Sequence, residues 1–218
     1  METVLIPRKE LFGNPDKASV QISPNGATIS FLAPRDGVLN VWVAPRENMD
    51  AARPVTQDTG RGIRFYLWAY TSAHILYIQD KNGDENWRMY CVELASGEVK
   101  DLTPYEGVQA QPYMVSPKRA EEIIVGLNDR DPQWHDVYQI NILSGKRTLL
   151  LENNRFLEFL VTDDNTVIGA AQMTEEGSIE LYRAAPEGWV LWEAIPQEDT
   201  LTTGYAGLDK TNTRLYFK

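Results

Sequence analysis

The sequence predicts an all-β fold made of β-propeller blades of about 46 residues each. The main observation is a sequence motif that recurs along the chain, in which a small polar corner precedes a short strand of alternating apolar residues. Its copies begin at Ser23, Ala69, Ser116, Thr162 and Asp209, in steps of 46, 47, 46 and 47 residues. A fixed period of this size is typical of repeat architectures, because each unit has an apolar face that only its neighbour can cover.

A second sequence motif follows the first at a nearly constant distance along the chain. The repeat is therefore a whole structural unit and not a single strand. Alternating strands with an aromatic residue are expected at 41–43, 89–94, 137–142 and 181–183. Ser-Gly corners at 96–97 and 144–145 predict hairpins whose return strands lie at 99–103 and 147–151. About four short strands in one period match a propeller blade.

The two recurring motifs also predict the domain organisation. Residues 1–18 form an N-terminal segment, and 19–218 form a partial propeller with blades at 19–64, 65–112, 113–158 and 159–204 and the start of a fifth at 205–218. A chain that stops inside a blade leaves strand edges unpaired. We therefore interpret it as a fragment of a larger propeller, the alternative being a short protein whose arc is open or closed by oligomer formation.

The composition and net charge of the chain indicate which kinds of binding partner are excluded. The chain is 43% hydrophobic and 24% charged, and its net charge is -10 from 21 basic and 31 acidic residues. This balance argues against a nucleic acid or an anionic membrane as partner, since both need a basic surface. The start of the chain has no basic region followed by an apolar one, so we expect a cytoplasmic protein.

The sequence contains no recognisable catalytic motif. The patterns G-x-S-x-G, H-E-x-x-H, C-x-x-C and the P-loop are absent. Of the two histidines, His74 is expected in a strand and His135 in a loop beside Asp136. We therefore expect no catalytic residue, no metal site and no cofactor in these 218 residues.

Acidic residues recur in the loop between the second and third strands of every expected blade, at 34–37, 80–87, 128–136 and 173–177. Equivalent loops of a propeller lie on one face, so these would form an acidic ring that also carries Trp87, Trp134 and Arg130. Two interpretations remain open. The loops are ordinary solvated turns, or the ring attracts a cationic group such as the amino terminus of a peptide.

Several segments resemble the amino-terminal region of prolyl oligopeptidase family serine peptidases, in the branch of acylaminoacyl peptidases and dipeptidyl aminopeptidase-like enzymes. They are IPRKELFGNPDKA at 6–18, QISPNG at 21–26, GVLNVWV at 37–43, DTGRGIR at 58–64, QDKNGDENW at 79–87, DLTP at 101–104 and GLNDRDP at 126–132. The resemblance is dense from about residue 6 to 145 and thinner beyond it.

The resemblance implies a propeller, often seven-bladed, that is followed by an α/β-hydrolase domain with a Ser-Asp-His triad. That domain is missing from this chain, so none of its residues is expected to be catalytic. Such a propeller admits short peptides to the active site and helps to hold their amino-terminal end. The implied partners are the catalytic domain of the same polypeptide and short peptide substrates. Our candidate substrate-binding residues are Asp84, Glu85, Asn86 and Trp87, with Arg130 and His135 opposite.

Two other functions fit a propeller. The first is a non-catalytic scaffold for protein-protein interaction, as in the periplasmic propellers whose corners are similar to that at Ser23. The second is an enzyme with a metal in its central channel, but the innermost strands expected at 20–22, 65–68 and 113–115 offer no ligands. Unpaired blade edges would also favour association with other chains.

Overall fold

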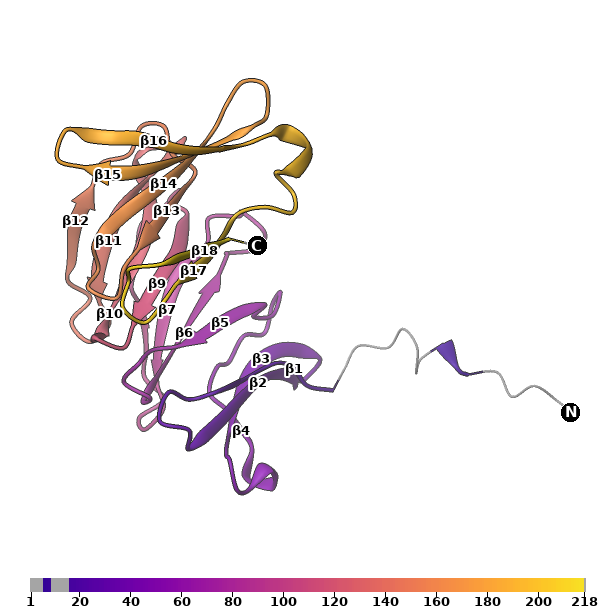
Figure 1. Ribbon diagram of the computed structural model, residues 1–218. Coiled ribbons are helices and arrows are strands. Elements are labelled where there is room, and N and C mark those ends of the chain that lie inside the picture. The colour runs from indigo at the N-terminus through magenta and orange to yellow at the C-terminus, as the bar shows by residue number, and fades with distance from the viewer. Residues whose placement is uncertain (1–5, 9–15, 218) are drawn as a thin grey trace, which may run out of the picture. The chain divides into compact units, whose positions relative to one another are not determined.

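The computed structural model describes residues 6–8 and 16–217, and it consists almost entirely of antiparallel strands (Figure 1). The chain divides into two compact units, 1–64 and 65–218. Most of the N-terminal segment expected at 1–18 lies outside the described residues. Each four-stranded sheet has its strands in sequence order, as the blades of a β-propeller do. The predicted fold class is confirmed.

The first unit contains one blade, whose strands are β1 (Ala18–Ile22), β2 (Thr28–Arg35), β3 (Val38–Pro45) and β4 (Arg53–Pro54), with a short 3-10 helix, η1 (Met49–Ala51), before β4. The β2–β3 hairpin has a two-residue turn at Asp36 and Gly37, whose φ angles are 51° and 84°. Two positive φ angles are what a tight hairpin turn needs to match the twist of its strands.

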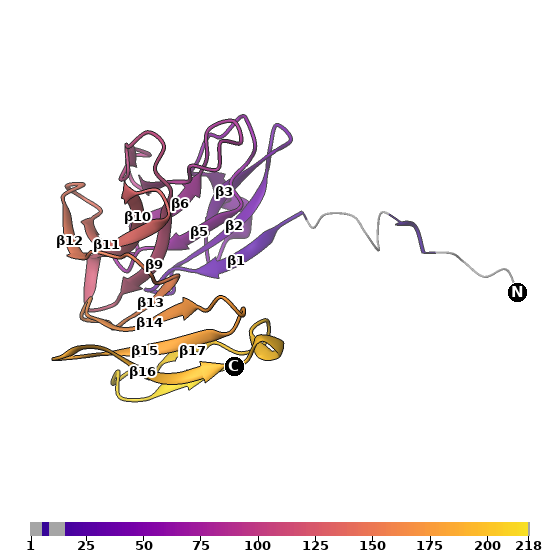
Figure 2. The same cartoon turned by 90° about the horizontal axis from the view of Figure 1, so that it is seen from above.

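The second unit contains three four-stranded blades and a two-stranded hairpin. The second blade consists of β5 (Phe65–Trp68), β6 (His74–Gln79), β7 (Arg88–Glu93) and β8 (Val99–Asp101). The third consists of β9 (Ala110–Ser116), β10 (Arg119–Asp131), β11 (Trp134–Asn141) and β12 (Arg147–Leu151). The fourth consists of β13 (Glu158–Val161), β14 (Val167–Met173), β15 (Ile179–Ala185) and β16 (Gly188–Ile195), and η2 (Gln197–Asp199) leads to the hairpin of β17 (Tyr205–Leu208) and β18 (Leu215–Phe217). Figure 2 shows β13 to β16 side by side.

The recurring polar corner connects the first and second strands of a blade. In the first blade the Ser23 hydroxyl accepts the Thr28 backbone N–H at 2.9 Å. In the fourth blade the Thr162 hydroxyl accepts the Thr166 N–H at 3.3 Å, and in the hairpin the Asp209 carboxylate accepts the N–H of Thr213 at 2.8 Å. The repeated corner is therefore a side chain that satisfies a backbone donor at the start of the second strand.

The apolar faces of neighbouring blades in the second unit pack against each other. Along β10, Ile123 and Val125 belong to a buried cluster with Leu76 and Met89 of the second blade. The intervening Ile124 belongs to a different cluster, with residues of the fourth blade. Since successive side chains of a strand point to opposite faces, β10 contributes to the core on both sides.

Gly126 of β10 lies where a side chain would collide with its neighbour. A Cβ atom there would lie 2.4 Å from the Tyr113 hydroxyl oxygen and 2.7 Å from Cζ of the same ring. We expect Gly126→Ala to lower the free energy of unfolding by roughly 1–3 kcal/mol, because an overpacked core must shift. Denaturant titration measures the loss. The double variant Gly126→Ala with Tyr113→Ala should recover part of it, and strictly additive losses would contradict this steric explanation.

Candidate functional site

The loop between β6 and β7 carries four of the candidate residues, and Asp84 organises it. Its carboxylate accepts the backbone N–H groups of Lys81 and Asn86, both at 3.1 Å. Desolvation acts to raise the pKa of Asp84, but these hydrogen bonds outweigh it and the pKa is lowered. Asp84 is thus an ionised loop-forming residue, and its carboxylate is largely engaged with the backbone of its own loop.

Glu85 differs from Asp84 in how its carboxylate is used. Its backbone has a φ angle of 58°, and its N–H donates to the Asp80 carboxylate at 3.3 Å. Its own carboxylate is exposed and has no hydrogen bond or ion pair with another described residue. Glu85 is therefore the acid of this loop that is free to meet a cationic ligand. Asn86 and Trp87 beside it are half-buried.

Gln109, in the connection between the second and third blades, ties this loop to the third blade. Its side-chain amide donates to the Glu85 carbonyl oxygen at 3.1 Å, and its backbone N–H donates to Oδ1 of Asn128 at 2.6 Å. The next residue, Ala110, donates its N–H to the carbonyl oxygen of Trp87 at 2.7 Å. The loops that hold the candidate residues of the two blades are therefore connected at one end of the second unit.

The candidate segment of the third blade is more ordered than the sequence suggested. A loop was expected at 128–136, but β10 extends to Asp131 and β11 begins at Trp134. The expectation that His135 lies in a loop was therefore wrong. The reason is local: the backbone N–H of Gln133 donates to the Asp131 carboxylate at 2.9 Å, which closes a tight turn.

Arg130 forms a forked ion pair with Asp136. Its Nε and Nη2 atoms lie 2.7 and 2.8 Å from the two carboxylate oxygens, and Nη2 also donates to the carbonyl oxygen of Asn153. The Asp136 carboxylate, whose side chain is 1% exposed, also accepts the Asn153 N–H at 2.7 Å. Desolvation acts to raise the pKa of Asp136, but its hydrogen bonds with Arg130 and Asn153 lower it. Arg130 is thus tied to the blade, while 41% of its side chain stays exposed.

His135 is half-buried, and among the described residues no hydrogen bond joins its ring to the Asp136 carboxylate. Its backbone carbonyl oxygen accepts the Asn153 side-chain amide at 3.1 Å, and its buried Nε2 atom has no hydrogen-bond partner among the described residues. Desolvation by burial lowers the pKa of the imidazole, so His135 is neutral at pH 7. A neutral ring can serve as a weak polar contact for a ligand, and it adds no charge.

Sequence reasoning missed the residues that organise these loops. Gln109 lies in an irregular connection and carries no recognisable pattern. Asn153 is buried in the connection between the third and fourth blades, where its donor and acceptor groups must both be satisfied, but its burial is visible only in the structure. Its amide oxygen accepts the Arg155 and Phe156 N–H groups, so it sets the path of the chain into the fourth blade.

Within the described part of the chain, no group of three or more His, Cys, Asp or Glu side chains is placed to hold a metal ion. No described helix has the length and apolar character that a membrane span requires.

Four-stranded blades with charged loops at one end define a β-propeller domain. No family model matches the chain. The sequence is 47% identical over 217 residues to dipeptidyl aminopeptidase BIII of Pseudoxanthomonas mexicana, an alignment that covers 99% of this chain and 32% of that protein. The chain spans about a third of the length of the curated relatives it matches, 32% and 31% for two of them.

Solved structures with low sequence identity show the fold alone. The β-propeller domain of the trilobed protease from Pyrococcus furiosus matches with a TM-score of 0.60 and 19% identity, over 93% of this chain and 62% of that domain. The acylaminoacyl peptidase of Pyrococcus horikoshii matches with a TM-score of 0.58 and 17% identity, over 94% of this chain and 35% of that one. The resemblance to the propeller region of prolyl oligopeptidase family serine peptidases is confirmed.

Proposed function

We propose that this chain is part of the propeller domain of a serine peptidase that cleaves short peptides, and that it helps to admit and dock the substrate. The bond-breaking serine would lie in an α/β-hydrolase domain of the same polypeptide. The observation that carries this proposal is the 47% identity to a dipeptidyl aminopeptidase over 99% of the chain. By itself the chain would hydrolyse nothing.

The loop geometry supports the docking role. A docked peptide needs a charged group at a fixed place, and the Glu85 carboxylate is exposed on a loop that Asp80, Asp84 and Gln109 hold by hydrogen bonds. A carboxylate attracts the ammonium group of a free amino terminus, whereas an acylated amino terminus has no charge to attract. We therefore favour a free-amine, dipeptidyl aminopeptidase type of substrate over an acylaminoacyl one.

The gating role follows from the needs of acyl transfer. The reaction is best protected from side reactions in a site closed to bulk water. A propeller that covers such a site admits short peptides by their size, while folded proteins are excluded. In this proposal Asn86 and Trp87 line the peptide's path beside Glu85. Arg130 presents the exposed part of its guanidinium, and His135 adds an uncharged contact.

Glu85→Gln in the complete natural protein tests the docking role. We expect KM for a free-amine dipeptidyl substrate to rise roughly two- to five-fold, which is the value of an exposed ion pair, with little change in kcat. Steady-state kinetics on the same dipeptide with a free and with a blocked amino terminus measures the difference. The substitution keeps the size of the side chain and the hydrogen bonds of the Glu85 backbone.

Glu98→Gln is the matched control, since Glu98 is an exposed acid of the same blade in the turn between β7 and β8, at the other ends of these strands. It should leave KM unchanged for both substrates. A similar rise in KM for the free and the blocked peptide, or the same rise with Glu98→Gln, would rule out charge-based docking at Glu85. The assignment to a peptidase propeller would survive that result if the protein still cleaved the peptides.

A further inference from the structure

The outermost strand of the fourth blade, β16, is a long sheet edge with one β-bulge, at Trp192. It has eight residues, whereas the corresponding strands β4, β8 and β12 have two, three and five. Each of those shorter edges carries a protective feature, namely Pro54 in β4, Lys100 in β8 and Arg147 in β12. The sequence of β16, GWVLWEAI, has no proline and no basic residue. Such an edge invites pairing with another strand.

Leu191 of β16 is an apolar side chain that is open to solvent, with 51% of it exposed. Trp192 is turned instead toward the β17–β18 hairpin, where its ring centroid lies 5.6 Å from that of Phe217. Leu191 pairs with Tyr182 of β15, whose ring contacts Phe156, so Leu191 lies on the face turned toward the third blade. On the same side a groove lies between β12 and the β15–β16 hairpin, and Leu150, Val167 and Trp189 are among its lining residues. An added strand would therefore find both a backbone edge and an apolar groove.

One backbone donor on β16 is not used by the sheet. The Ala194 N–H donates to the Glu193 carboxylate at 3.1 Å, in an exposed hydrogen bond with the side chain of the preceding residue. A bond of this kind is easily exchanged for one to an incoming strand, because both groups are in water. The edge can thus accept a partner without breaking its pairing with β15.

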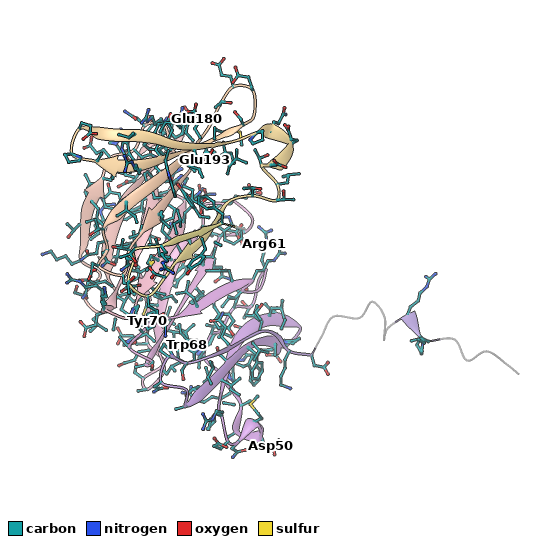
Figure 3. The ribbon with its side chains drawn as sticks, in the orientation of Figure 1. Asp50, Arg61, Trp68, Tyr70, Glu180 and Glu193 are labelled. Carbon is teal, nitrogen blue, oxygen red and sulfur yellow. The ribbon has the colours of Figure 1, made fainter. Side chains whose placement is uncertain are left out.

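The charge around this edge selects the partner. Residues 167–204 contain seven carboxylates and one basic side chain, Arg183. Glu193 is in β16 itself and Glu180 lies opposite Ala194 in β15; both are labelled in Figure 3. The other nearby cation, Arg155, lies over the rings of Phe156 and Tyr182. A second copy of this chain would bring the same excess of acidic residues, whereas a basic strand would be attracted.

We propose that the free edge of β16 binds an extended peptide segment in which apolar and Lys or Arg residues alternate, by addition of a strand to the fourth blade. Backbone hydrogen bonds provide the affinity, the apolar side chains enter the groove beside Trp189, and the basic side chains, on the opposite face of the strand, meet Glu193. This surface is on the outer rim of a blade, and the proposal does not depend on the docking role of Glu85.

The experiment measures binding of a fluorescent acetyl-(Val-Lys)4-amide peptide to the complete natural protein by anisotropy. We expect binding that weakens several-fold between 0.05 and 0.5 M salt, and that exceeds binding of the (Val-Glu)4 peptide. Leu191→Lys, which places a basic residue on the edge, should weaken it about tenfold. Leu149→Lys is the matched control on β12. Leu149 is 44% exposed and pairs with Tyr138, on the face turned toward the second blade.

Ala194→Pro tests whether the peptide binds by strand addition or by charge attraction alone. It removes the outward N–H without removing a bond to β15 and leaves the net charge unchanged, so we again expect a loss of about tenfold. Unchanged affinity in this variant would overturn strand addition. Equal losses with Leu191→Lys and Leu149→Lys, equal binding of the acidic peptide, or self-association that Leu191→Lys abolishes in sedimentation would overturn the proposed site or its partner.

Discussion

Replacing Asp136 with Asn lowers the free energy of unfolding by roughly 2–4 kcal/mol in our expectation, because one member of a largely buried ion pair is lost. The amide cannot accept two charge-assisted hydrogen bonds from Arg130 together with the N–H of Asn153. The expected loss is smaller than for a fully buried pair, since 41% of the Arg130 side chain is exposed and water can reach it. Thermal or denaturant unfolding of the protein measures the loss.

The ion pair of Arg130 and Asp136 also predicts how the stability of the protein depends on pH. The pKa of Asp136 is lower in the folded protein than in the unfolded chain, where an aspartate has a pKa of about 3.9. The contribution of the carboxylate to stability is therefore complete above that value and disappears as the pH falls through the lower, folded pKa. The difference in stability between wild type and Asp136→Asn should accordingly be constant near neutral pH and should shrink below about pH 4.

Asp164→Asn provides the control, because Asp164 forms an ion pair with Lys118 at 3.1 Å in which the two side chains are 60% and 47% exposed. An exposed pair of this kind contributes about 0–1 kcal/mol. Similar losses for Asp136→Asn and Asp164→Asn would show that the forked pair with Arg130 contributes no more than a surface contact.

The fold could be predicted from the sequence because its signals are local and repeated. Each polar corner bonds its own backbone, as Ser23 and Asp209 do, and each strand alternates between two packing faces, as β10 does. The strands β1, β5 and β9 lie where the innermost strands were expected, and β12 coincides with the expected return strand. The other expected return strand, at 99–103, ends two residues earlier, at Asp101. There the Thr103 hydroxyl accepts the N–H of Met89.

The candidate site was less accessible to sequence reasoning, because residue type does not reveal how a side chain is used. Asp84 and Glu85 are adjacent acids, yet one is bonded to its own loop and the other is free. Arg130 was expected as a lining residue, and the structure shows that much of its hydrogen-bonding capacity is used by Asp136 and Asn153. These uses depend on contacts made across 6 and 23 residues of sequence, which no local pattern records.

Phe156→Ala is the other substitution with a large expected effect, a loss of roughly 3–5 kcal/mol in the free energy of unfolding. The Phe156 ring is 5% exposed and lies in a cluster between the third and fourth blades. Its centroid is 5.8 Å from that of Phe159, 5.5 Å from Tyr182 and 4.9 Å from Trp189, all edge-on. Truncation loses the burial of the ring and leaves a cavity lined by rigid side chains, which cannot easily close it.

Amide hydrogen exchange distinguishes a local effect at this boundary from a general loss of stability. In a repeat architecture, stability is approximately the sum of the units and the contacts between neighbours. Phe156→Ala should therefore raise exchange most in β13 and β14, and less in β6 and β7 of the second blade. Phe65→Ala removes a ring of the same size that is 43% exposed, and it should cost less than half as much. A uniform rise in exchange across all the blades would contradict the view that this cluster acts at one boundary.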